Sequence, residues 1–88
     1  MRIVVDAQLP FAAETFAGLG EVVRVPTAQL DAAALRDADA AILRSVTPVN
    51  VSLLDGSPVR FVGTATSGID HVDVPYLRRA GIGFADAA

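Results

Sequence analysis

The stretch that decides the fold is RFVGTATSGIDHVD, residues 60–73. It begins as an apolar segment of strand length, in which Phe61 and Val62 suit the interior of a sheet. Gly63 and Gly68 then allow close backbone approach and expose N–H groups beside three hydroxyl side chains. The stretch therefore predicts a strand that ends in a turn suited to a small anionic ligand.

Strand-like segments recur along the chain at residues 2–6, 21–25, 40–43 and 60–65, with a weaker one at 82–85. Segment 40–43 is apolar at every position, which is typical of a strand covered on both faces. Short strands that alternate with helices predict parallel pairing through right-handed crossovers. The sequence thus predicts an α/β fold of the three-layer flavodoxin-like type, with a five-stranded, mainly parallel sheet and flanking helices.

Capping residues place four helices between these strands. The first begins near Pro10 and puts Ala12, Phe16 and Leu19 on one apolar face. The other three have an acid or an amide at the N-cap and cover residues 32–36 after Asp31, 51–54 after Asn50, and 73–79 from Asp73 with Gly81 as the C-cap.

Composition excludes several functions. With 88 residues, 52% hydrophobic and 19% charged, the chain is one globular unit. The absence of cysteine excludes disulfides and thiol chemistry. A net charge of −3, with Arg78-Arg79 as the only adjacent basic pair, makes nucleic acid and membrane surfaces unexpected partners. The apolar start is too short for a signal peptide or a membrane span, so we expect a cytoplasmic protein.

Familiar ligand motifs of such sheets are missing. After the first strand the chain reads DAQLP instead of G-x-G-x-x-G, so it carries no dinucleotide fingerprint. No lysine follows Gly68, which excludes a P-loop, and Arg44 stands where a phosphorylated receiver domain needs an acid. Polar residues instead follow strands one, three and four, at Asp6, at Arg44 with Ser45, and at 64–66. In this fold class ligands bind at that edge, where the strand order reverses.

A combination of motifs carries a family resemblance. The motifs are RSVT at 44–47, SLL at 52–54, FVGTAT at 61–66, Gly68, DHVD at 70–73 and AGIGF at 80–84. The chain resembles the amino-terminal segment of the D-isomer-specific 2-hydroxyacid dehydrogenases. It is most similar to the branch that oxidises 4-phosphoerythronate with NAD in vitamin B6 biosynthesis. The resemblance covers essentially all 88 residues, and RSVT together with FVGTAT is more specific than either motif alone.

The resemblance implies that residues 1–88 are a single substrate-binding segment of the catalytic domain. Ser45 and Thr66 match the family's substrate-contacting hydroxyls, and we add Gly68 and the charged side chain of Arg44. The implied ligand is a small phosphorylated hydroxy acid. The family's inserted NAD-binding domain and its catalytic arginine, glutamate and histidine are not in this sequence. We therefore expect no catalytic residue, no bound cofactor and no metal here, and an inactive chain when alone.

Several alternatives stay open. Ser45 and Thr66 also suit simple turn formation, and Arg44 suits a solvated or carboxylate-paired side chain. His71 is expected to be structural, and together with Asp70 and Asp73 it offers too few ligands for a metal. The chain as a whole also fits a free-standing, non-enzymatic module for binding or self-association. In either case we expect a homo-oligomer, such as a dimer, because sheet edges would be exposed.

Overall fold

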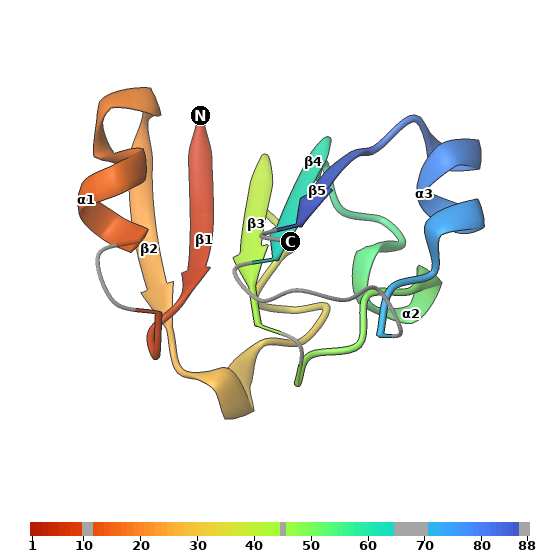
Figure 1. The fold of residues 1–88 in the computed structure, drawn as a ribbon, viewed down its shortest axis with the longest axis horizontal. Coiled ribbons are helices and arrows are strands. Elements are labelled where there is room, and N and C mark those ends of the chain that lie inside the picture. The colour runs from red at the N-terminus through yellow and green to blue at the C-terminus, as the bar shows by residue number, and fades with distance from the viewer. Residues whose placement is uncertain (10–11, 45, 65–70, 87–88) are drawn as a thin grey trace.

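The computed structural model describes residues 1–9, 12–44, 46–64 and 71–86. Its strands are β1 (Arg2–Asp6), β2 (Glu21–Val25), β3 (Ala40–Leu43), β4 (Phe61–Thr64) and β5 (Gly83–Asp86). They pair in parallel throughout, in the order β2-β1-β3-β4-β5 (Figure 1). This is the flavodoxin-like order, so the predicted fold class is confirmed. Ala65, the last residue of the predicted fourth strand, lies outside the described residues.

Helices lie on both faces of the sheet. The helix α1 (Ala12–Phe16) and the 3₁₀ turn η1 (Ala17–Leu19) follow β1, while α2 (Val51–Leu54) and α3 (Val74–Ala80) follow β3 and β4. Figure 1 shows α1 on one side of the sheet, with α2 and α3 on the other. Alternation along β1 explains this arrangement, because Val4 belongs to the core under α2 and α3, whereas Ile3 and Val5 pack toward Phe16.

The caps of α2 and α3 are those the sequence predicts. The side chain of Asn50 accepts a hydrogen bond from the Leu53 N–H at 3.1 Å, and that of Asp73 accepts one from the Tyr76 N–H at 3.1 Å. Gly81 ends α3 in the left-handed conformation, with φ of 73°. Such a backbone favours glycine, which explains why α3 ends there.

The expected helix at 32–36 is wrong. Asp31 does cap the backbone N–H of Ala34 at 3.0 Å, but residues 32–37 form successive turns. One isolated i→i+4 bond, from the Leu35 N–H to the Asp31 carbonyl at 3.3 Å, remains of a helical pattern. The next bonds along the segment, from the Arg36 N–H to the Ala33 carbonyl at 3.4 Å and from the Ala38 N–H to the Leu35 carbonyl at 3.1 Å, span three residues, so no run of helical bonds follows the first one. The segment is held instead by Leu35 and Ala38, which are fully buried.

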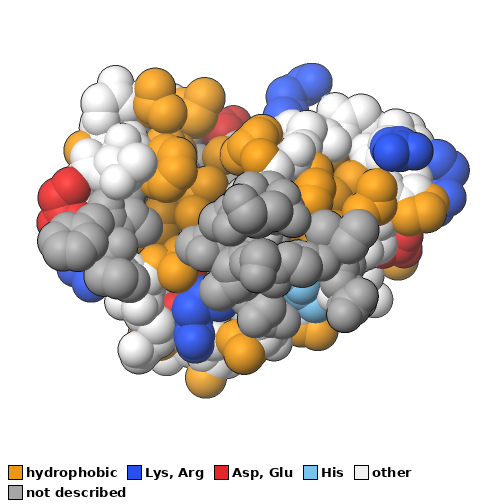
Figure 2. All heavy atoms as spheres, viewed as in Figure 1, with side chains coloured by type: hydrophobic (Ala, Val, Ile, Leu, Met, Phe, Trp, Pro, Cys, Tyr) orange, Lys and Arg blue, Asp and Glu red, His pale blue; other side chains and the backbone are white. Residues whose placement is uncertain are grey.

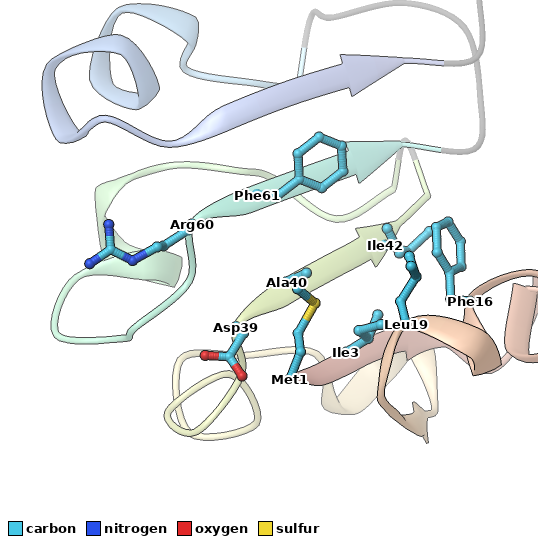
Figure 3. Close-up of a pocket in the computed structure, with 9 residues that line it drawn as sticks. All are labelled: Met1, Ile3, Phe16, Leu19, Asp39, Ala40, Ile42, Arg60 and Phe61. Atoms are coloured by element: carbon cyan, nitrogen blue, oxygen red, sulfur yellow. The ribbon is translucent and has the colours of Figure 1, made fainter.

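The α1 face of the sheet carries an apolar groove of about 610 Å³. Hydrophobic side chains gather in the recess beside α1 in Figure 2. In Figure 3, Phe16 and Leu19 line one side, Phe61 lies over β4, and Asp39 and Arg60 stand at one end. Leu19 is 62% exposed. Phe16 is half-buried, so the two described side chains of the apolar face predicted from residues 12, 16 and 19 are covered only in part, because the chain turns into η1 before Leu19 reaches the sheet.

Candidate functional site

Polar residues lie at the carboxyl edge of the sheet. Asp6 is the last residue of β1, Thr64 is the last of β4, and Arg44 directly follows β3. The strands β1 and β3 are neighbours, and the direction of strand addition reverses between them. Asp6 and Arg44 therefore flank the topological switch point, where ligands of this fold class bind.

An ion pair spans this switch point. The Nε of Arg44 donates to Oδ2 of Asp6 at 3.1 Å, across 38 positions of sequence. The carboxyl group is completely buried, whereas the arginine side chain is 31% exposed. The pair therefore has one anchored member and one member that reaches solvent.

Thr27 closes the cluster from the short turn η2 (Thr27–Gln29), which follows β2. Its hydroxyl donates to Oδ1 of Asp6 at 2.7 Å and accepts from Nη2 of Arg44 at 2.9 Å. The backbone N–H of Gln8 adds a further hydrogen bond to Oδ1 of Asp6, at 2.8 Å. Residues beyond the ends of three strands thus converge on one carboxylate.

The environment of Asp6 favours its charged form. Burial alone would raise the pKa of the carboxyl group, but the hydrogen bonds from Gln8, Thr27 and Arg44 and the nearby positive charge outweigh burial and lower the pKa. Asp6 therefore stays ionised at neutral pH and keeps its attraction for the guanidinium.

The chain segments after β3 and β4 are joined beside this cluster. Val49 and Val72 form an isolated parallel bridge. The Val49 N–H donates to the His71 carbonyl at 2.8 Å, and the Asp73 N–H donates to the Val49 carbonyl at 2.8 Å. Nearer to β3, the Thr47 N–H donates to the Arg44 carbonyl at 3.2 Å, which shapes the turn at 44–47. The bridge holds the segments that lead into α2 and α3 next to each other.

Of the four predicted site residues, the structure describes Arg44 alone. Ser45, Thr66 and Gly68 lie outside the described residues, and their roles stay predictions. Arg44 is paired with a carboxylate, which is the alternative that the sequence left open. Its Nη1 has no hydrogen-bond partner among the described residues.

Sequence reasoning placed Asp6 at this edge but gave it no role, and it missed Thr27. One signal was present, because an acid that directly follows three apolar strand residues is buried and needs donors. Thr27 carried no comparable signal, since it only follows Pro26, which comes directly after the end of β2.

His71 and the acids near it make no metal centre in the described part of the chain. No three Asp, Glu, His or Cys side chains gather there closely enough to hold an ion, and Asp70 lies outside it. The Nε2 of His71 is buried and has no hydrogen-bond partner among the described residues.

None of the described helices is long and apolar enough to cross a lipid bilayer.

The sequence matches the model of the family described as D-isomer specific 2-hydroxyacid dehydrogenase, catalytic domain, over residues 4–88. The chain belongs to this family. Curated erythronate-4-phosphate dehydrogenases from Chromohalobacter salexigens and Escherichia coli O157:H7 are 56% and 55% identical to it over 87 residues. Each alignment covers 99% of this chain but 23% of the relative, so the chain spans about a quarter of the length of these enzymes.

Solved structures of two dehydrogenases share the fold. The NAD⁺-bound 3-phosphoglycerate dehydrogenase of Entamoeba histolytica superposes with a TM-score of 0.79 at 26% identity, covering 98% of this chain and 32% of its own. The D-lactate dehydrogenase of Aquifex aeolicus, complexed with NAD and lactic acid, gives a TM-score of 0.76 at 18% identity, covering 96% and 27%. These relatives are oxidoreductases that hold NAD, and the likeness to the second concerns the fold alone.

Proposed function

We propose that this chain is the substrate-binding segment of an NAD-dependent 4-phosphoerythronate dehydrogenase, which acts in cytoplasmic vitamin B6 biosynthesis. The observation that carries the proposal is the Arg44–Asp6 pair across the switch point. It puts a partly exposed guanidinium where this fold class binds ligands. The 56% identity to an erythronate-4-phosphate dehydrogenase supports the choice of substrate.

In this proposal the ligand is a small phosphorylated hydroxy acid held between the segments that follow β3 and β4. Ser45 and Thr66 supply hydroxyl donors, and the backbone at Gly68 supplies an N–H group. Arg44 adds a charge-assisted hydrogen bond through Nη1, the guanidinium nitrogen without a partner among the described residues. The Val49–Val72 bridge supports this arrangement, because it ties both segments to one frame.

Alone, the chain binds its substrate but transfers no hydride. The 88 residues contain no lysine, no cysteine and no G-x-G-x-x-G loop after a strand, and the single histidine is His71. NAD and the groups that move the hydride and the proton then belong to the remaining three quarters of the enzyme. When bound there, NAD would accept the hydride that leaves the substrate.

The test is a titration of the 88-residue chain with 4-phosphoerythronate, followed by amide chemical shifts. We expect saturable shifts at Arg44, Ser45 and residues 66–68, and smaller shifts with inorganic phosphate or erythronate at equal concentration. Added NAD should produce no NADH absorbance. Absence of shifts at millimolar 4-phosphoerythronate contradicts substrate binding, and NADH formation contradicts catalytic inactivity.

Matched variants sharpen the titration. Ser45→Ala and Thr66→Ala should each weaken binding by about tenfold, since each removes one hydrogen bond to a charged ligand. Ser52→Ala is the control, because Ser52 is an exposed residue of α2. Equal affinities for all three variants would show that the hydroxyls at 45 and 66 form turns only.

A second candidate is a self-associating module, and one observation favours it. The apolar groove on the α1 face is bordered by Met1, Leu19 and Phe61, which are all exposed. Sedimentation should then show a homodimer that Phe61→Asp dissociates. Val51→Asp, at an exposed position on α2 away from the groove, should leave the dimer intact. A monomeric wild-type chain would exclude this candidate.

A further inference from the structure

Both oxygens of the Asp6 carboxylate accept hydrogen bonds from the protein. It is completely buried, its Oδ1 accepts hydrogen bonds from the Gln8 N–H and the Thr27 hydroxyl, and its Oδ2 accepts from Arg44. A ligand therefore has no access to this acid, and the acid is not placed for proton transfer to one. Any effect of Asp6 on a ligand acts through the groups that it binds.

Asp6, Thr27 and Arg44 form a closed ring of hydrogen bonds. Thr27 uses its one hydroxyl proton on Asp6 and accepts from Nη2 of Arg44, while Nε of Arg44 donates to Asp6. The guanidinium is planar, so fixing Nε and Nη2 also fixes the direction of Nη1. Nη1 is the nitrogen without a partner among the described residues.

We propose that Asp6 and Thr27 are positioning residues, which hold the Arg44 guanidinium so that Nη1 binds the anionic group of the substrate. The proposal rests on the proposed function, because it needs a ligand at Arg44. An unrestrained arginine would lose rotamer freedom when it binds an anion, whereas the Asp6–Thr27 ring has already ordered this one during folding. The ring thus improves affinity by preorganisation.

The ring also limits non-selective anion binding. Asp6 neutralises Arg44, so the cluster as a whole carries no net charge. A free anion then gains little from long-range attraction, and it must satisfy the hydrogen-bond direction that Nη1 offers. Such a site selects a ligand that other contacts hold in the correct orientation.

A positioning role and simple electrostatics predict opposite changes in ligand affinity for one substitution. Asp6→Asn removes a negative charge near a bound anion, so electrostatics alone predicts tighter binding. Positioning predicts weaker binding, because the guanidinium loses its charge-assisted anchor. A purely structural pair predicts no change in affinity beyond the loss of folded protein.

The experiment measures the affinity of the 88-residue chain for 4-phosphoerythronate by amide shifts. We expect Asp6→Asn and Thr27→Val to bind about tenfold more weakly than wild type, and Thr27→Ser to bind like wild type because it keeps the hydroxyl. In the Arg44→Ala background, Asp6→Asn should add no further loss. The Arg44 Nε–H resonance should be sharp in wild type and broadened in Asp6→Asn.

The outcomes separate the two proposals. If the wild-type chain does not bind 4-phosphoerythronate, the proposed function fails, and the positioning role fails with it. If wild type binds 4-phosphoerythronate, and Asp6→Asn and Thr27→Val bind it as tightly as wild type or more tightly, only the positioning role is overturned. Should Asp6→Asn not fold, the comparison of Thr27→Val with Thr27→Ser decides, since Thr27 is only partly buried.

Discussion

The two faces of the sheet are built very differently. Under α2, α3 and the turns at 31–37, thirteen buried apolar residues of the described chain form one continuous core. On the α1 face the buried cluster has four members, Ile3, Val5, Ala40 and Ile42. Phe61, which lies on this second face, is 39% exposed at the edge of the groove. Parallel sheets are normally covered on both faces. In this chain the face under α2 and α3 is covered, whereas the α1 face is covered only in part.

The difference shows which part of the sequence stabilises the fold. Apolar burial is the main favourable term in folding, so the face under α2 and α3 supplies most of the stability. The polar cluster of Asp6, Thr27 and Arg44 stands at the carboxyl end of that same face, because Asp6 and Val4 point to the same side of β1. The candidate site is therefore supported by the better packed half of the molecule.

The largest expected effect is on the packed face. Leu77 is 1% exposed within the thirteen-residue core, and Leu77→Ala removes buried methyl groups and leaves a cavity. We expect a loss of about 2–5 kcal/mol in the free energy of unfolding, which is a large share of the stability of a small domain. Urea denaturation followed by circular dichroism measures it. A loss below about 1 kcal/mol would contradict the larger contribution of the packed face.

The second prediction concerns the stability of the fold at low pH. The pKa of folded Asp6 lies below its unfolded value of about 3.9, so the group stabilises the fold above that pH. As pH falls through the unfolded and then the folded pKa, this stabilisation is lost. Urea midpoints measured from neutral pH downward should drop at the acid end, and Asp6→Asn should flatten the drop. An identical pH profile for the variant would contradict the role of Asp6.

A smaller effect is expected on the open face. Phe61→Ser removes an aromatic ring that is partly exposed, so we expect a loss of about 1 kcal/mol, well below the value for a buried phenylalanine. The same urea assay measures it beside Leu77→Ala. A loss equal to that of Leu77→Ala would mean that the groove is closed in solution.

The smallest effect is expected at Leu19, which is 62% exposed where η1 ends. Leu19→Gln should change the free energy of unfolding by no more than about 0.5 kcal/mol, as is usual for surface positions. A thermal unfolding scan is sufficient to check this. A clearly destabilised variant would place Leu19 in a packed interface, contrary to the open face described above.

Much of the fold followed from the sequence because strands and caps leave strong local signals. Apolar runs such as 40–43 predicted the strands, and the caps at Asn50, Asp73 and Gly81 correctly placed α2 and α3. The segment 32–36 misled because its alanine-rich composition favours a helix, whereas a single i→i+4 bond forms there and burial of Leu35 and Ala38 holds the segment in successive turns. Leu19 misled because periodicity does not reveal where a helix changes to a 3₁₀ turn.

The candidate site was less predictable. The sequence correctly placed Asp6 and Arg44 at one edge, since Asp6 ends one apolar strand of a parallel sheet and Arg44 follows another. It did not predict that they pair, because a contact across 38 positions depends on strand order and side-chain direction. Thr27 was missed for the same reason. The roles of Ser45, Thr66 and Gly68 stay predictions that the proposed titration tests.

The seam between β1 and β3 has a consequence for folding kinetics. Only three residue pairs join these strands, from Ile3↔Ala40 to Val5↔Ile42, and each closes a long stretch of chain. Such contacts form late in folding, because the chain must lose loop-closure entropy before the contacts can stabilise it. We therefore expect the Asp6–Arg44 pair to be unformed in the folding transition state. Weakening it should then speed unfolding and leave the refolding rate almost unchanged.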